Sequence, residues 1–148
     1  MDTILIVEDD RTIDSIISEE LNQWGYHTQS IGDFTTVYET FKSFNPDLVL
    51  MDISLPHYNG FYWTQKIRQE SNVPIVFILS HAESMDMVQA IQFGADVYIT
   101  KPIDIAVTRA KIQAILRRTY DYTLESDKLS YGALTLNLSS AKLEGQDF

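Results

Sequence analysis

Hydrophobic and polar positions follow two alternating patterns along the first 120 residues. Continuous apolar runs, typical of strands covered on both faces, alternate with segments in which apolar residues recur every three or four positions, as in amphipathic helices. These patterns predict strands at residues 3–7, 26–31, 47–51, 75–79 and 97–100. They predict helices at residues 13–24, 37–44, 61–70, 84–93 and 104–120.

Five strands that alternate with five helices predict an α/β domain, a parallel sheet with helices on both faces. Right-handed crossovers and this number of elements favour the flavodoxin-like strand order 2-1-3-4-5. In such sheets ligands bind beyond the carboxyl ends of the strands. The residues that follow the strands are therefore the first candidates for a functional site.

The last 28 residues follow a different pattern. Residues 121–128 are polar and predict a linker, whereas residues 129–138 alternate like a strand or a hairpin. Too few residues follow for a second hydrophobic core. The predicted organisation is an α/β domain at residues 1–120, a linker at 121–128 and the start of an incomplete second domain at 129–148.

Composition narrows the class of protein. The formal charge of −10 argues against nucleic-acid binding by this chain alone, because phosphate contacts require a basic surface. The absence of cysteine excludes disulfides and thiolate metal sites. No apolar run is long enough to span a bilayer and none has the form of a signal peptide, so we expect a soluble, cytoplasmic protein with no membrane partner.

Polar side chains follow four of the predicted strands at their carboxyl ends. In chain order they are Glu8, Asp9 and Asp10, then Asp52, then Ser80, and then Lys101. In a parallel sheet these ends lie along one edge, so we expect the side chains to lie close together. Crowded carboxylates raise each other's pKa unless a positive charge joins them. Mg²⁺ fits this requirement, because it binds one or two carboxylates, several waters and a phosphate oxygen.

The acidic residues have the chemistry of a phosphoacceptor and its metal ligands. Asp52 would act as the nucleophile, because carboxylates form acyl-phosphate intermediates. Asp9 would bind the metal directly, and Glu8 would bind it directly or through water. The backbone carbonyl of Ser54 is placed to complete the protein ligands.

Lys101 and Ser80 would bind the phosphoryl group. The ammonium group of Lys101 would neutralise phosphoryl oxygens, and Ser80 would donate its hydroxyl to them. Taken singly, a polar residue at a strand end is more often an ordinary loop or capping residue, and Asp10 has the position of a helix cap. The site is favoured because polar residues follow four strands whose carboxyl ends lie along the same edge of the sheet.

Three segments resemble the receiver domains of two-component response regulators. They are residues 7–10 (Val-Glu-Asp-Asp), residues 52–60 and residues 94–102, with Ser80 between the last two. The resemblance covers residues 1–120 and implies a signalling switch more than an enzyme. It implies phosphotransfer from a sensor histidine kinase to Asp52, a cis peptide bond before Pro102, and a switch in which Ser80 and Tyr98 move together.

A second resemblance concerns the end of the chain. Residues 129–137 resemble the opening sheet of the winged-helix DNA-binding domain of OmpR/PhoB-type regulators. The recognition helix would then lie beyond Phe148, so the chain would be an artificially truncated form or a shortened gene product, and DNA would be bound only through the missing domain. Residues 60–63 and 71–74 resemble regulators of transporters that protect Gram-positive bacteria from cell-wall-active peptides.

The OmpR/PhoB resemblance also implies a homodimer through the fourth helix, the fifth strand and the fifth helix. Val97 stands where the family often has an acid, and Ile103 stands where it often has Phe. Val107 and Gln113 occupy positions of the last helix at which charged residues are common in that group. These departures weaken the case for a charge-paired dimer but leave the phosphorylation site intact.

Three other functions are compatible with this fold class. A pseudo-receiver would bind partners without ever carrying phosphate, but the whole set of site residues is present. An aspartate-nucleophile phosphatase needs a second acid two residues after the nucleophile, where this chain has Ser54. A flavin carrier would have a phosphate loop rich in Ser, Thr and Gly after the first strand, and this sequence has none.

Overall fold

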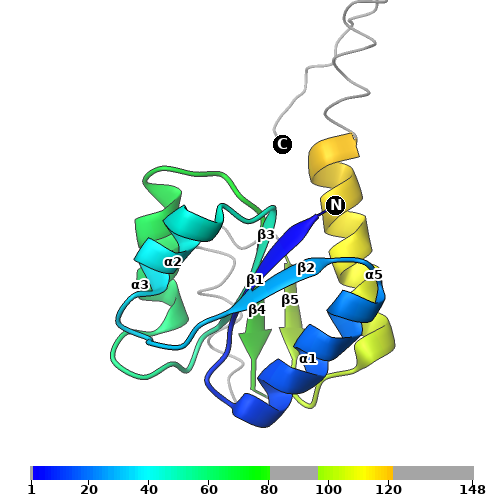
Figure 1. Cartoon of the computed structure of the whole chain (residues 1–148), viewed down its shortest axis with the longest axis horizontal. Helices are drawn as coiled ribbons and strands as arrows, with labels where there is room; N and C mark the ends of the chain where they lie inside the picture. Colours follow the sequence, from blue (N-terminus) through cyan, green and yellow to red (C-terminus); the bar gives the residue numbers. More distant parts are fainter. Residues whose placement is uncertain (1, 81–96, 122–148) are drawn as a thin grey trace, which may run out of the picture. The chain divides into compact units, whose positions relative to one another are not determined.

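The computed structural model describes residues 2–80 and 97–121. One parallel sheet has the strand order β2-β1-β3-β4-β5, which confirms the flavodoxin-like prediction (Figure 1). The strands are β1 (Thr3–Val7), β2 (His27–Ser30), β3 (Leu48–Asp52), β4 (Ile75–Leu79) and β5 (Val97–Thr100). The bounds of β1, β4 and β5 are as predicted, whereas β2 is shorter by one residue at each end and β3 begins and ends one residue later.

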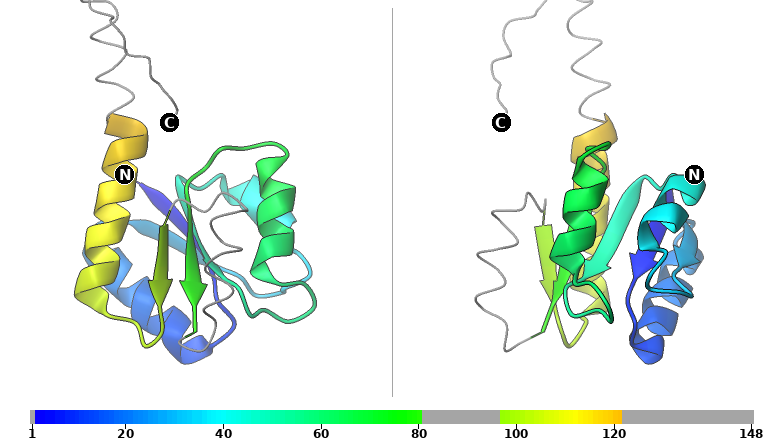
Figure 2. Two further views of the ribbon diagram at one scale, coloured as in Figure 1. Left: turned by 180° about the vertical axis from the view of Figure 1, so that it is seen from behind. Right: turned by 90° about the vertical axis from the view of Figure 1, so that its left-hand side faces the viewer.

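Helices cover both faces of the sheet. They are α1 (Arg11–Gln23), α2 (Val37–Phe44), α3 (Gly60–Arg68) and α5 (Ile105–Leu116). Helices α2 and α3 lie on one face and α1 and α5 on the other, as the two views of Figure 2 also show. The helix predicted at 84–93 and the segments predicted at 122–148 lie outside the described residues. None of the described helices is long and apolar enough to cross a membrane.

The chain divides into two units, residues 1–115 and residues 116–148. In the second unit the described residues are the last residue of α5 and a π-type helical turn, Arg117–Asp121. The final helix was predicted to run to residue 120, but the regular α-helix ends at Leu116, where the wider turn begins. The functional candidates that the structure describes all belong to the first unit.

The central strands are buried on both faces, which explains why they are continuous apolar runs in the sequence. Alternate residues of β1, β3 and β4 pack against α2 and α3, among them Leu5, Val49, Met51 and Phe77. The residues between them are also fully buried, among them Ile4, Ile6, Leu50 and Ile78. Strand β2 lies at the edge of the sheet and alternates between exposed and half-buried residues, as its polar sequence predicts.

Capping residues fix where two helices begin. Oδ1 of Asp10 accepts hydrogen bonds from the backbone N–H groups of Thr12 at 3.0 Å and Ile13 at 3.3 Å, which confirms the predicted cap of α1. Asn59 caps α3 in the same way, since its Oδ1 accepts from the N–H of Tyr62 at 3.0 Å. Both caps start a helix a few residues beyond a strand, which holds the intervening polar residues at the edge of the sheet.

Neighbouring isoleucines in α1 allow a matched test of this packing. Ile17 is 1% exposed and Ile16 is 46% exposed. We expect Ile17→Ala to lower the free energy of unfolding by about 2–5 kcal/mol, because it removes buried methyl groups and leaves a cavity. Ile16→Ala should change it by less than about 0.5 kcal/mol. Urea denaturation of both variants measures the difference, and equal losses would contradict the assignment of faces.

Candidate functional site

Three carboxylates meet beyond the carboxyl ends of β1 and β3. One carboxylate oxygen from each of Glu8, Asp9 and Asp52 lies within 4.8 Å of the other two. Glu8 is 1% exposed and Asp52 is 2% exposed, whereas Asp9 is exposed to solvent. The cluster, hereafter the acidic cluster, therefore has two acids in the protein interior and one that reaches water.

The register of the sheet is what brings Glu8 to Asp52. Val7 of β1 pairs with Met51 of β3, so the residues that follow them, Glu8 after the end of β1 and Asp52 at the end of β3, are acids at the same level. Asp52 is the last residue of its strand and pairs with Ile78 of β4. Two acids that are 44 positions apart in the sequence thus share one small volume.

Lys101 reaches the acidic cluster from β5. Its Nζ lies 3.3 Å from Oδ2 of Asp52 and 3.4 Å from Oε2 of Glu8. Strand β4 separates β5 from β3, so the long side chain spans the intervening strand. The peptide bond between Lys101 and Pro102 is cis, as the resemblance implied, and the Lys101 N–H donates to the carbonyl of Leu79 at 2.7 Å.

The remaining contacts of the acidic cluster leave one acceptor without a partner. The N–H of Ser54 donates to Oδ1 of Asp52 at 3.3 Å, and the N–H of Asp10 donates to Oε2 of Glu8 at 3.1 Å. Among the described residues, the buried Oε1 of Glu8 has no hydrogen-bond partner. An orphaned buried carboxylate oxygen costs free energy, and a bound cation would satisfy it. The acidic cluster is thus compatible with a divalent metal site.

Burial and crowding perturb the titration of the acidic cluster. Burial, together with the hydrogen bond and the negative charge of Asp52, raises the pKa of Glu8 to about 8. Burial also raises the pKa of Asp52, although Glu8 and Lys101 act in the opposite direction. Burial lowers the pKa of Lys101, but the charges of Asp52 and Glu8 outweigh it and the net shift is upward. The charged form of Lys101 and the protonated form of Glu8 are thus both favoured.

Two further predicted residues lie at the same edge of the sheet. Ser80 is half-buried and directly follows β4, and Ser54 is exposed two residues after Asp52. The binding roles predicted for the Ser54 carbonyl and the Ser80 hydroxyl stay predictions. Tyr98, in β5, is half-buried, and its carbonyl accepts a hydrogen bond from Nζ of Lys111 at 2.7 Å, while the same ammonium lies 5.2 Å from the centroid of its ring.

Sequence reasoning missed one residue that supports the site, Gly60. Its N–H donates to the carbonyl of Ile53 at 2.9 Å, and its Cα packs directly on the backbone of Asp52. An added Cβ would collide with the carbonyl oxygen of Asp52 and lie 3.1 Å from the side chain of Met51. The Asn59-Gly60 pair signals only a turn in the sequence, so the close approach to Asp52 had to come from the structure.

Comparison with known proteins identifies the family. The sequence pattern of the response regulator receiver domain matches residues 4–113, which include every member of the acidic cluster and Lys101. The chain belongs to the response regulator receiver domain family. As a receiver domain it is a signalling module and not a metabolic enzyme.

Curated relatives are GraR response regulators of staphylococci. The chain is 44% identical over 145 residues to the response regulator protein GraR of Staphylococcus epidermidis RP62A, a match that covers 97% of this chain and 65% of that protein. It is 46% identical over 145 residues to GraR of Staphylococcus saprophyticus, with the same coverage. The chain therefore spans slightly less than two thirds of the length of these relatives.

Solved receiver domains have the same fold. The N-terminal domain of the nisin resistance regulator NsrR, a lantibiotic response regulator, has a TM-score of 0.75 and 47% identity, and the match covers 79% of this chain and 99% of that one. The beryllofluoride-activated receiver domain of Klebsiella pneumoniae RstA has a TM-score of 0.74 and 29% identity, covering 78% of this chain and 99% of that one. The receiver fold is thus shared with experimentally determined relatives.

The raised pKa of Glu8 predicts how stability depends on pH without metal. Folded Glu8 keeps its proton up to a pH of about 8, whereas its ordinary pKa is 4.5, so the folded state binds more protons in this window. In EDTA the free energy of unfolding should therefore fall as pH rises from about 5 to about 8, by at least ~1 kcal/mol. Urea denaturation at several pH values measures this slope.

Glu8→Gln is the control for that slope. The amide does not titrate, so this variant should lose most of the dependence between about pH 5 and about pH 8. An unchanged slope in Glu8→Gln would contradict the assignment of the raised pKa. A divalent cation in the acidic cluster would stabilise the wild type more at the upper end of the range, because it would bind the deprotonated carboxylates.

The two alanine substitutions Gly60→Ala and Gly32→Ala test the contact between Gly60 and Asp52. Gly60→Ala should lower the free energy of unfolding by about 1–3 kcal/mol and weaken Mg²⁺ binding, because the methyl group displaces the backbone of Asp52. Nothing lies within 4 Å of a Cβ added to Gly32, so Gly32→Ala should leave Mg²⁺ binding unchanged. Urea denaturation and Mg²⁺ titration measure both quantities, and unaltered metal binding in Gly60→Ala would contradict a supporting role for this glycine.

Proposed function

We propose that Asp52 accepts a phosphoryl group from a phosphohistidine of a sensor histidine kinase. The observation that carries this proposal is the environment of Asp52, a buried carboxylate at a strand end that shares the acidic cluster and also lies 3.3 Å from the ammonium of Lys101. A buried acid between further acids and a cation has little structural use. It is suited to hold a metal and an incoming phosphoryl group.

Glu8, Asp9, Asp52 and the carbonyl of Ser54 would hold Mg²⁺. When bound, the metal supplies positive charge against the phosphoryl oxygens. A carboxylate oxygen of Asp52 attacks phosphorus as the bond from phosphorus to the imidazole nitrogen breaks, and the imidazole leaves as a neutral ring after it takes up a proton. The N–H of Ser54 and the ammonium of Lys101 would keep the carboxylate of Asp52 in place during this step.

Lys101 and Ser80 would bind the transferred group and report its presence. Lys101 bridges Asp52 and Glu8, so it can exchange one carboxylate for a phosphoryl oxygen with a small movement. Ser80 would donate its hydroxyl to the same group from the end of β4. Tyr98, whose strand pairs with β4, would then swing inward and change the surface around β5 and the flanking helices.

The output of this switch would be the regulation of transcription in the cytoplasm. Residues 1–120 would be the receiver domain, 121–128 the linker and 129–148 the start of a winged-helix DNA-binding domain, so DNA would be bound only through that second domain. Dimerisation would use the fourth helix, β5 and α5. The identities of 44–47% to GraR proteins and to the lantibiotic regulator NsrR support a role in the response to cell-wall-active peptides.

Chemical phosphorylation tests the role of Asp52. Incubation with acetyl phosphate and Mg²⁺ should add one phosphoryl group, about 80 Da by intact mass spectrometry. Asp52→Asn should add none, because an amide does not form an acyl phosphate. Equal labelling of this variant would overturn the proposal, and an unlabelled wild type would favour a pseudo-receiver that binds partners without phosphate.

Two neighbouring acids provide a matched control for the metal. Asp9→Asn should weaken Mg²⁺ binding at least ~10-fold, in a titration followed by tryptophan fluorescence, and should slow labelling of Asp52. Asp10→Asn keeps the cap of α1, because asparagine caps helices as well as aspartate does, and should leave Mg²⁺ binding nearly unchanged. Equal effects of the two substitutions would show that only the total charge near the site matters.

A further inference from the structure

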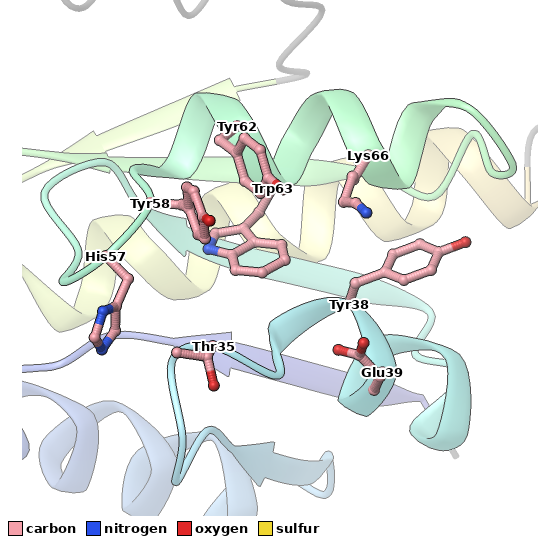
Figure 3. A pocket seen from close by; sticks show the side chains of 8 residues that line it. All are labelled: Thr35, Tyr38, Glu39, His57, Tyr58, Tyr62, Trp63 and Lys66. Atoms are coloured by element: carbon pink, nitrogen blue, oxygen red, sulfur yellow. The ribbon is translucent and has the colours of Figure 1, made fainter.

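A second hollow lies between α2 and α3 and contains none of the acidic-cluster residues. Its volume is about 500 Å³, within the range of small-molecule sites. Figure 3 shows the side chains that line it, which come from α2 and the segment before it, from the loop between β3 and α3, and from α3 itself. We call it the α2–α3 pocket.

Aromatic rings form one wall of the α2–α3 pocket. Tyr58 and Tyr62 are stacked with their centroids 4.2 Å apart. The indole of Trp63 stands nearly perpendicular to both, at 89° to Tyr58 and 82° to Tyr62. Trp63 is only 3% exposed, whereas Tyr58 and Tyr62 are 48% and 37% exposed. Two exposed rings beside a buried indole offer a face on which another flat ring can pack.

The buried indole carries an unsatisfied donor. Among the described residues, Nε1 of Trp63 has no hydrogen-bond acceptor, although buried tryptophans normally have one. In Figure 3 the nitrogen-bearing edge of the indole faces Tyr58. Tyr58 belongs to the loop between β3 and α3 and is half-exposed, so a rotation of its side chain would open this donor to a ligand.

The α2–α3 pocket also contains a cation, the ammonium of Lys66. Nζ of Lys66 lies 5.4 Å from the centroid of the Tyr38 ring, and Nζ of Lys42 lies 5.7 Å from the same ring. Lys42 pairs with Glu70 at 3.2 Å, whereas no carboxylate of the described residues lies within ion-pair distance of Lys66. The acid of the pocket, Glu39, lies on the other side of Tyr38 from Lys66 in Figure 3.

We propose that the α2–α3 pocket binds a small planar aromatic carboxylate that carries a second hydrogen-bond acceptor. Once Tyr58 has rotated, the ligand ring takes its place against Tyr62 and Trp63. The carboxylate pairs with Lys66, and the second acceptor receives the indole N–H. The two polar groups assigned to the ligand, the ammonium of Lys66 and the indole N–H of Trp63, are both donors, which selects an anion over an amine.

Titration with 6-hydroxy-2-naphthoate tests the proposal by NMR. The sequence has two tryptophans, so ¹⁵N-labelled protein gives two indole N–H signals, and Trp24→Phe identifies that of Trp63. We expect the Trp63 signal to move downfield and to saturate with a Kd of ~1 mM or tighter. The matched amine 6-(aminomethyl)-2-naphthol should bind at least about fivefold more weakly, because Lys66 repels it.

Lys66 and Lys42 both lie near the ring of Tyr38 and provide a matched pair of variants for this titration. Lys66→Gln should weaken binding of the naphthoate about threefold to tenfold, because it removes the charge that faces the carboxylate. Lys42 lies over the same tyrosine but does not line the pocket, so Lys42→Gln should change the Kd by less than about twofold. A Trp63 signal unmoved by the naphthoate, amine binding as tight as that of the acid, or equal effects of the two substitutions would each overturn the proposal.

Discussion

The mutual repulsion of two buried carboxylates, Glu8 and Asp52, is the constraint on which the functional site depends. Each is almost completely removed from water, and Lys101 supplies one positive charge against both. A buried charge without compensation costs several kcal/mol, so a fold selected for stability alone would not keep this arrangement. Without metal the conflict is resolved by protonation, as the raised pKa of Glu8 shows. A divalent cation would resolve it and leave the carboxylates ionised.

The sheet topology makes this crowding unavoidable. Because β1 and β3 are adjacent parallel strands in register, acids placed after Val7 and Met51 must lie side by side. The strand order puts β5 two positions away from β3, which is within reach of a lysine but not of a short side chain. The chemistry therefore follows from three local choices of residue, each made at the end of a strand that is otherwise apolar.

The sequence contained the strands and the acids, but not the environment of each acid. The continuous apolar runs predicted the bounds of β1, β4 and β5 correctly. Strands that are buried on both faces consist of consecutive apolar residues, so their ends are visible in the sequence. The edge strand β2 was predicted one residue too long at each end. Its residues are polar, so hydrophobicity does not mark where the strand begins and ends. Glu8 and Asp9 are neighbours of the same charge, yet only the first is buried. That difference depends on side-chain packing, which periodicity does not describe.

The loop between β3 and α3 links the acidic cluster with the α2–α3 pocket. At one end the N–H of Ser54 binds Asp52, and at the other Gly60 packs on the backbone of that same residue. Between them Tyr58 lies against the indole of Trp63. This short loop is held at both ends by Asp52, so its backbone has few accessible conformations. A change at the Asp52 carboxylate and a rotation of Tyr58 would therefore both alter the conformation of the same loop. Linkage then requires that any free energy of coupling between the two sites be equal in both directions.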